Sequence, residues 1–147
     1  MSKYDCLKLE NQLCFPLYAC SKAVTRHYKP LLDEFDLTYT QYITMMVLWD
    51  RKCASVKEIG ECLYLDSGTL TPVINKLESK GYIDKQRSND DARGVLVSVT
   101  ESGMKLREKM VKVPNAMSGC VDLTEKEAGE LYTLLYKVLK HFDEIDS

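Results

Sequence analysis

Residues 66–99 read DSGTLTPVINKLESKGYIDKQRSNDDARGVLVSV, and this stretch decides the fold. Its first half spaces four apolar side chains at i, i+3, i+4 and i+7, which predicts an amphipathic helix over about 67–80. These side chains are Leu70, Val73, Ile74 and Leu77. Asp66 or Ser67 can cap the start of this helix, and Gly81 is a typical residue for its end.

A β-hairpin is expected directly after this helix. The run 82–87 is strand-like, 88–94 consists of turn residues, and 95–99 is rich in β-branched residues. Two strand-like runs on either side of such a turn are typical of an antiparallel hairpin.

Three S/T-x-x-E/Q motifs mark the starts of further helices. They begin at Thr38, Ser55 and Thr124, and each precedes a run with helical apolar spacing. In such a motif the hydroxyl accepts a hydrogen bond from a free amide of the first turn, while the Glu or Gln side chain reaches back. The helix expected after Thr124 carries an apolar stripe over about four turns.

Two more helices are expected, and a proline bears on each. The segment from about 9 to 35 has mostly helical apolar spacing, which Pro16 interrupts as a kink or as the true first turn. Thr100 can cap another helix that runs to about Val113 and is stopped by Pro114.

The order of these elements predicts a mainly α fold with a β-hairpin wing. Three compact helices followed by the hairpin form a winged helix-turn-helix over about 38–100, within a single domain of residues 1–147. The long helices expected over about 8–35 and 101–143 have no partner in that unit. We expect a twin subunit to bury their apolar stripes, which makes the protein a homodimer.

Length, charge and hydropathy limit the possible classes of protein. With 147 residues and a formal net charge of −2, the chain favours one domain and excludes a histone-like or polybasic-tail protein. No apolar run approaches the roughly 18 residues of a membrane span. The first residues are charged and show no apolar signal region, so we expect a cytoplasmic protein without a membrane partner.

Six cysteines need an interpretation, and they are Cys6, Cys14, Cys20, Cys53, Cys62 and Cys120. The chain contains no C-x-x-C, and its two histidines lie far apart in sequence, so no zinc site and no other cofactor is expected. The remaining interpretations are small core side chains, redox-active thiols, or some of each.

The helix over 67–80 is the second helix of the helix-turn-helix, which enters the major groove of DNA. Its face opposite the apolar one carries Ser67, Thr69, Thr71, Asn75 and Lys76. These groups suit phosphates and base edges, although any amphipathic helix has a solvated polar face of this kind.

Arg93 lies in the turn of the hairpin, where an arginine can enter a narrow minor groove. Asp91, two residues earlier, can orient its guanidinium group by a bidentate bond. From Val56 to Arg107 there are eight Lys or Arg and eight Asp or Glu residues. Binding to a pseudo-palindromic operator would therefore depend on placed residues, doubled by dimer symmetry, rather than on excess positive charge.

Four stretches of the chain resemble the MarR-type regulators, and specifically their organic-hydroperoxide-sensing OhrR branch. They are LENQLCF at 9–15, YKPLLD at 28–33, LTY at 37–39 and LYLDSGTLTP at 63–72, and Asp91-Ala92-Arg93 matches the Asp-x-Arg of the family's wing. The resemblance covers about residues 9–139. It implies a homodimeric repressor of peroxide-defence genes, released from double-stranded DNA when an organic hydroperoxide oxidises a reactive cysteine.

The resemblance also assigns the sensor residues. The reactive cysteine corresponds to Cys14, and the two tyrosines that hydrogen-bond its sulfur correspond to Tyr28 and Tyr39. Tyr28 follows Cys14 by 14 residues, which is about 21 Å along one helix at 1.5 Å per residue. The two side chains therefore meet only between subunits or across a break at Pro16.

Two-cysteine members of the branch carry a resolving cysteine in the region of Cys120, so Cys120 is the candidate partner for oxidised Cys14. If Cys120 is incidental, a low-molecular-weight thiol would cap Cys14 instead.

Two other functions compete with this interpretation. A thiol peroxidase would use Cys14 catalytically, but no thioredoxin-like βαβ pattern is present, so we do not expect an enzyme. The other is a MarR-type repressor relieved by a small aromatic ligand at the dimer interface, with inert cysteines. The nine tyrosines of the chain fit that alternative.

Overall fold

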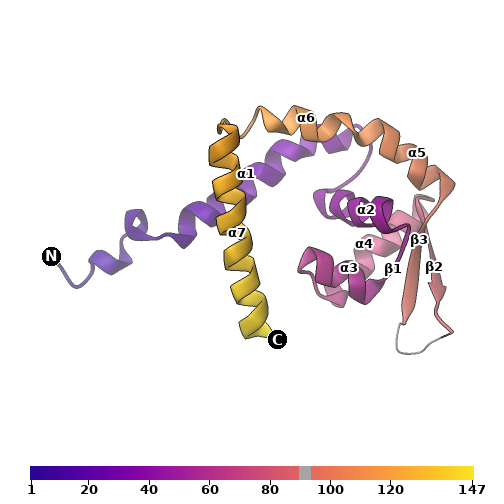
Figure 1. The fold of residues 1–147 in the computed structure, drawn as a ribbon, viewed down its shortest axis with the longest axis horizontal. Helices are drawn as coiled ribbons and strands as arrows, with labels where there is room; N and C mark the ends of the chain where they lie inside the picture. Colours follow the sequence, from indigo (N-terminus) through magenta and orange to yellow (C-terminus); the bar gives the residue numbers. More distant parts are fainter. Residues whose placement is uncertain (90–93) are drawn as a thin grey trace. The chain divides into compact units, whose positions relative to one another are not determined.

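The computed structural model describes residues 1–89 and 94–147 (Figure 1). Two compact units make up the chain, Met1–Pro114 and Asn115–Ser147, and each is described by itself below. That residues 1–147 form one functional domain stays a prediction.

The first unit begins with two short 3-10 turns, η1 (Asp5–Leu7) and η2 (Leu9–Asn11), and then the helix α1 (Cys14–Asp33). The helix expected over 8–35 thus starts later, at Cys14. Pro16 does not interrupt α1 but lies in its first turn. A proline is tolerated there because the first amides of a helix have no intrahelical acceptor to lose.

The winged helix-turn-helix is confirmed. Its helices are α2 (Tyr39–Arg51), α3 (Val56–Leu63) and α4 (Ser67–Ser79), and its hairpin strands are β2 (Ile83–Arg87) and β3 (Val95–Val99). Capping boxes start α2 at Thr38 and α3 at Ser55, as the sequence motifs predict. Asp66 is the residue that caps α4, because its carboxylate accepts a bond from the Thr69 amide.

The wing contains a third strand that the sequence analysis missed, β1 (Cys53–Ser55). It pairs antiparallel with β3, so the strand order in the sheet is β1-β3-β2 and β3 is central. Figure 1 shows these strands beside the three helices. A strand of three residues between two helices is too short to show an alternating pattern.

The core of this unit lies between the helices and the sheet. Leu48, Ile59, Leu70, Ile74 and Val97 are among its fully buried side chains, together with other residues of α2, α4 and β2. The apolar face predicted for α4 therefore packs inward. Burying such side chains supplies most of the free energy that stabilises the fold.

The helix α5 (Glu101–Met110) joins this core at Gly103. The Trp49 indole donates a hydrogen bond of 2.9 Å to the Gly103 carbonyl. A Cβ atom at Gly103 would lie 2.3 Å from the Tyr82 carbonyl oxygen and 2.7 Å from a methyl group of Val99. Only glycine permits this close approach of α5 to the sheet.

The prediction that one helix runs from Thr100 to about Val113 and is stopped by Pro114 is wrong at its end. α5 ends at Met110, and α6 (Lys112–Ser118) contains Pro114 in its first turn. Sequence alone does not separate a proline that stops a helix from one that begins the next, because a helix start tolerates proline.

The second unit contains α7 (Glu125–Asp146), which starts at the capping box of Thr124, as predicted. Leu131, Leu134, Val138 and Phe142 of its apolar stripe are exposed in the single chain. No helix in the described ranges is long and apolar enough to cross a membrane.

Candidate DNA-binding face and redox site

The outward face of α4 carries the five residues predicted to bind DNA. Ser67, Thr69, Thr71, Asn75 and Lys76 are all exposed. The Thr71 hydroxyl donates to the Ser67 carbonyl at 2.7 Å, so its oxygen remains available as an acceptor. All five groups are thus exposed on α4, whereas Leu70, Ile74 and Leu77 of the same helix are buried.

Asn75 is held by a residue of the wing that the sequence analysis did not single out. The Lys85 ammonium group, from β2, donates to the side-chain oxygen Oδ1 of Asn75. Lys85 is itself anchored to α4, because its amide donates to the Glu78 carboxylate at 3.2 Å and its ammonium lies 3.7 Å from that carboxylate. Contacts between a strand and a helix ten residues earlier leave no periodic signal in the sequence.

The start of α4 stabilises the ionised form of the Asp66 carboxyl. Hydrogen bonds from Thr69 hold the pKa of the Asp66 carboxyl below its ordinary value. A carboxylate at this position caps the helix and interacts favourably with its dipole. The cap fixes the first turn, which carries Ser67 and Thr69.

The predicted minor-groove residue Arg93 and its neighbour Asp91 lie outside the described residues. The wing is described up to Asn89 and again from Gly94. The Ser88 amide donates to the Gly94 carbonyl at 2.8 Å, which closes the hairpin just before that gap.

The structure brings the two predicted sensor tyrosines together. The ring centroids of Tyr28, on α1, and Tyr39, the first residue of α2, are 4.9 Å apart. Tyr42, three residues after Tyr39 on the same helix, completes a cluster with centroid distances of 5.8 Å to Tyr28 and 6.3 Å to Tyr39. Tyr42 is buried, whereas the other two rings are half-exposed.

Burial raises the pKa of the Tyr28 phenol above its ordinary value. Burial also raises the pKa of Tyr39, and the nearby Tyr28 phenol adds to that shift. Both phenols are therefore protonated throughout the neutral range, which makes them O–H donors. Two half-exposed phenols side by side can both donate a hydrogen bond to one anionic acceptor.

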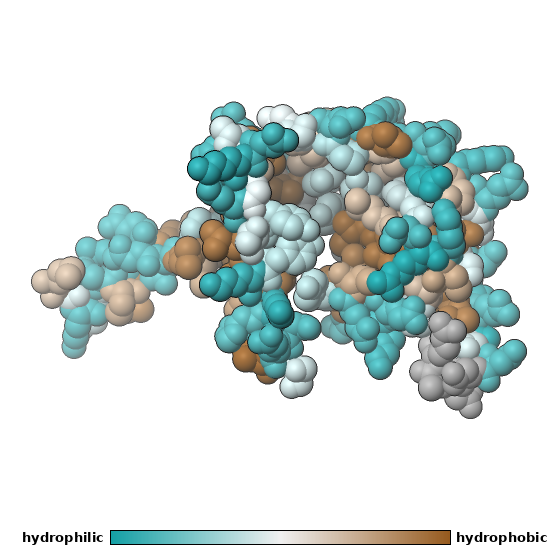
Figure 2. Space-filling model, in the orientation of Figure 1, coloured by the Kyte–Doolittle hydropathy of each residue, from teal (hydrophilic) through white to brown (hydrophobic). Residues whose placement is uncertain are grey.

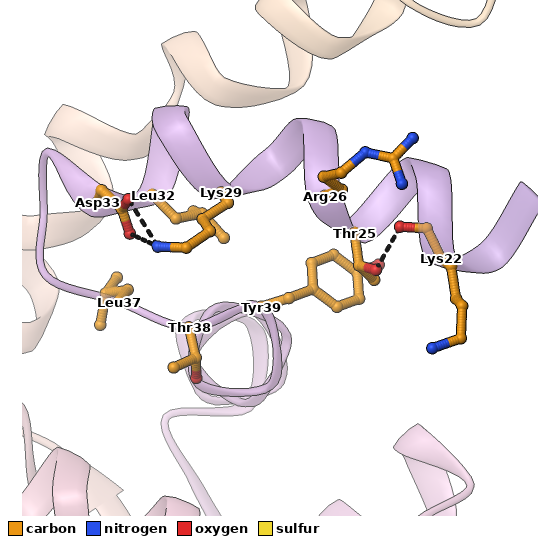
Figure 3. Close-up of a pocket in the computed structure, with 9 residues that line it drawn as sticks. All are labelled: Lys22, Thr25, Arg26, Lys29, Leu32, Asp33, Leu37, Thr38 and Tyr39. Atoms are coloured by element: carbon orange, nitrogen blue, oxygen red, sulfur yellow. Dashed lines mark hydrogen bonds and ion pairs between the residues drawn. The ribbon is translucent and has the colours of Figure 1, made fainter.

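A hollow of about 500 Å³ lies beside Tyr39 (Figure 3). Its walls include Lys22, Arg26 and Lys29 from α1, and Thr38 and Tyr39 from the start of α2. In Figure 3 the Tyr39 ring extends along α1, and a dashed line joins Lys29 to Asp33. That ion pair of 2.9 Å engages one of the three cations.

Cys14 is the first residue of α1, and it is exposed. Because α1 is unbroken from Cys14 to Asp33, the distance of about 21 Å along the helix separates Cys14 from Tyr28 of its own chain. The route across a break at Pro16 is therefore excluded.

Cys120 lies in the second unit, between α6 and α7, and is exposed. Its amide donates to the Met117 carbonyl at 3.0 Å, and its thiol lies 3.7 Å from the Ala116 carbonyl.

The other cysteines are not small core side chains. Cys6, Cys20 and Cys53 are exposed, and Cys62 is half-buried. Across the described residues, no three acidic, histidine or cysteine side chains are grouped so that they could hold a metal ion.

Comparison with known proteins identifies the family. Residues 26–110, more than half of the chain, match the family model described as the transcriptional regulator SarA/Rot. The chain is 46% identical, over 139 residues and 95% of each sequence, to the organic hydroperoxide resistance transcriptional regulator of Bacillus subtilis.

Solved structures with the same fold include four of AbfR, a protein of Staphylococcus epidermidis. The reduced form bound to DNA has a TM-score of 0.78 and 31% identity, covering 96% of this chain and 99% of that one. The disulfide form has a TM-score of 0.63 and 33% identity, covering 97% of both.

The chain therefore belongs to the MarR-type winged-helix transcriptional regulators that include the SarA/Rot group, which confirms the resemblance stated from its motifs. The chain is thus a transcriptional regulator, as its relatives are, and the AbfR structures show that a protein of this fold binds DNA in a reduced form and also forms a disulfide.

Proposed function

We propose that this protein is a homodimeric repressor that leaves a pseudo-palindromic operator when an organic hydroperoxide oxidises Cys14. The observation that carries the proposal is the pair of protonated phenols of Tyr28 and Tyr39, 4.9 Å apart between ring centroids, with Cys14 of their own chain about 21 Å from Tyr28 along α1. The thiol that these donors serve is then Cys14 of a second copy. In the cell, the protein would act in the cytoplasm, where its operator lies.

Exposed apolar side chains support the second copy. Leu13, Phe15 and Leu17 at the start of α1 are exposed, as is the stripe of α7. In Figure 2 the N-terminal segment is mostly hydrophilic, whereas apolar surface gathers near the start of α1. Exposed large apolar side chains on each of these helices are typical of an interface, and a twofold-symmetric dimer buries the same surface on both partners.

The oxidation proceeds by attack of the Cys14 thiolate on the terminal oxygen of the hydroperoxide. An S–O bond forms as the O–O bond breaks, sulfur loses two electrons, and the alkoxide leaves and takes up a proton to become an alcohol. The Tyr28 and Tyr39 phenols stabilise the thiolate before the attack. Afterwards they face a sulfenic acid, which is itself a donor, so their hydrogen bonds must rearrange.

The sulfenic acid has two possible resolving partners. The Cys120 thiol of the other subunit can displace water from it to form a disulfide, which requires the two Cα atoms to come within about 7 Å. If Cys120 is not in reach, a low-molecular-weight thiol does the same chemistry. We favour Cys120 because it is exposed and lies between two helices, in a segment without regular structure.

The dimer presents two copies of α4 to successive major grooves, whose half-site centres lie about 34 Å apart. Ser67, Thr69, Thr71, Asn75 and Lys76 are the proposed contacts, with Arg93 and Asp91 of the wing as the minor-groove pair. Release follows when the oxidised dimer interface no longer holds the two copies of α4 at that spacing.

A gel shift with DNA from upstream of the protein's own gene tests the proposal. The reduced wild-type protein binds, and cumene hydroperoxide releases it. Cys14→Ser binds equally well but is not released, because its hydroxyl is no nucleophile towards peroxide oxygen. Release of Cys14→Ser by the hydroperoxide would refute the role of Cys14.

The hollow beside Tyr39 favours a second candidate, relief by a small aromatic anion. Lys22 and Arg26 line that hollow and would pair with a carboxylate, while the Tyr39 ring would stack on an aromatic group. Release of Cys14→Ser from DNA by benzoate, without any oxidant, would favour this alternative. The wild-type protein without ligand is the control.

A further inference from the structure

Lys80, the residue that follows α4, connects the recognition helix to the turn at Asp36, which precedes Tyr39. Its ammonium group donates to the backbone carbonyl of Asp36 and lies 3.5 Å from the carboxylate of the same residue. It also donates to the Gln41 side-chain oxygen at 3.2 Å. The Lys80 side chain is only 23% exposed, which is unusual for a lysine and means that it is held against this turn.

The other end of this contact is the capping box of α2. The Gln41 oxygen also accepts from the Thr38 amide at 3.1 Å, and the Thr38 hydroxyl accepts from the Gln41 amide at 3.2 Å. Tyr39 lies between these two residues as the first residue of α2. The Gln41 side chain is thus shared between the turn that positions Tyr39 and the residue that ends α4.

The turn before Tyr39 is itself tightly constrained. Asp36 has a positive φ of 54°, a backbone conformation that few residues other than glycine adopt. The Asp36 and Leu37 amides donate to the Asp33 and Leu32 carbonyls at 3.0 and 3.1 Å, which ties the turn to the end of α1. Figure 3 shows Thr38 and Tyr39 projecting in different directions from the start of α2. The turn can therefore change its own conformation only a little when the Tyr39 ring is displaced.

We propose that Lys80 is a positioning residue that transmits the oxidation state of the sensor cysteine from Tyr39 to the recognition helix α4. This inference rests on the proposed function, because it requires that oxidation moves Tyr39. Its physical basis is that one ammonium group bonds both Asp36 and Gln41, so a displacement of the turn is passed to the end of α4 and to the core on which α4 packs. Coupling of this kind is a free-energy difference between two states, and it is measured as a ratio of affinities.

Lys80→Met tests the inference because the substitution leaves no buried group unpaired. Gln41 keeps its bond from the Thr38 amide, and the Asp36 carboxylate is 97% exposed and remains solvated. Methionine keeps most of the aliphatic stem that packs there. The variant is therefore expected to fold, and Lys80→Arg is a second variant that retains a cationic donor.

The matched control is Lys112→Met. Lys112 also forms a link across the first unit, a bond of 2.9 Å from its ammonium group to the Glu34 carboxylate at the end of α1. This link ends near the same turn but does not involve α4. Lys112→Met therefore removes a cation from the same region but leaves the contacts of Lys80 with Asp36 and Gln41 in place.

The experiment measures the operator Kd before and after oxidation by cumene hydroperoxide, and the rate of Cys14 oxidation by trapping the sulfenic acid. For Lys80→Met we expect an unchanged oxidation rate and a reduced-state Kd close to that of the wild type. The ratio of oxidised to reduced Kd should fall by about fivefold or more, within the usual range of coupling between sites. Lys80→Arg and Lys112→Met should keep the wild-type ratio.

The outcomes separate this inference from the proposed function. If the wild type is not released on oxidation, the proposed function fails. If the wild type is released and Lys80→Met is released to the same extent, the coupling role of Lys80 is overturned. An equal loss of affinity in both redox states would show that Lys80 contacts a phosphate instead, and slower oxidation of Cys14 would show that it acts on the sensor.

Discussion

The substitution Tyr28→Phe removes one phenol O–H from the proposed thiolate site and little else. The ring remains, so its packing on Tyr39 at 4.9 Å and on Tyr42 at 5.8 Å is kept. Since the Tyr28 phenol is half-exposed, its loss leaves no buried polar group unpaired. The expected change is therefore in the chemistry of Cys14 and not in stability.

The magnitude follows from the bond that is lost. A hydrogen bond to a charged group contributes about 1.5–3 kcal/mol. Because about 1.4 kcal/mol corresponds to one pH unit of a titration, the pH profile of Cys14 alkylation should move up by about one to two units. At a pH below the titration midpoints of both proteins, the thiolate fraction, and with it the rate of oxidation by cumene hydroperoxide, should fall by about ten- to a hundredfold.

The assay is the rate of iodoacetamide alkylation against pH, in a variant that keeps Cys14 as its sole cysteine. Tyr39→Phe should shift the profile in the same direction. Tyr42→Phe is the matched control, because Tyr42 belongs to the same ring cluster but is buried behind the two donors. Profiles for Tyr28→Phe and Tyr39→Phe that coincide with that of Tyr42→Phe would refute the donor role and leave these rings as packing residues.

Three further predictions concern the resolving thiol, the wing and the core. Wild-type protein treated with cumene hydroperoxide should run as a covalent dimer on a non-reducing gel and Cys120→Ser as a monomer, whereas a covalent dimer that survives Cys120→Ser would exclude this cysteine as the partner of Cys14. Arg93→Ala should weaken operator binding by about 1–3 kcal/mol per half-site without a change in thermal stability, and an unchanged Kd would contradict the minor-groove contact. Gly103→Ala should lower the free energy of unfolding in urea by about 1–3 kcal/mol or more, because its Cβ would lie 2.3 Å from the Tyr82 carbonyl oxygen; an unaltered midpoint would contradict this reasoning.

The sequence predicts the helix starts well because each depends on neighbouring residues. The capping boxes at Thr38, Ser55 and Thr124 are all present in the structure, since both partners lie within one turn. The roles of the prolines were harder to predict, because a proline in the first turn of a helix and a proline that stops a helix give the same local signal. Pro16 and Pro114 both lie in first turns.

The candidate site was predicted only in part. Tyr28 and Tyr39 follow from the resemblance, and Tyr42 was detectable as a residue three positions after Tyr39 on one helix face. The contacts of Lys80 with Gln41 and of Lys85 with Asn75 join segments that no periodicity relates. Such pairs are determined by how the helices and the sheet pack, which a single sequence does not show.

Ser55 is at once the last residue of β1 and the cap of α3. Because β1 is bonded to β3, the wing and α3 share this residue, and neither can turn without the other. The part of the chain that reads DNA therefore behaves as a stiff block, and its own shape is not the variable under control. In the proposed dimer, oxidation would alter the separation of two such blocks. An operator lengthened or shortened by one base pair between its half-sites should then change which redox state of the protein binds it better.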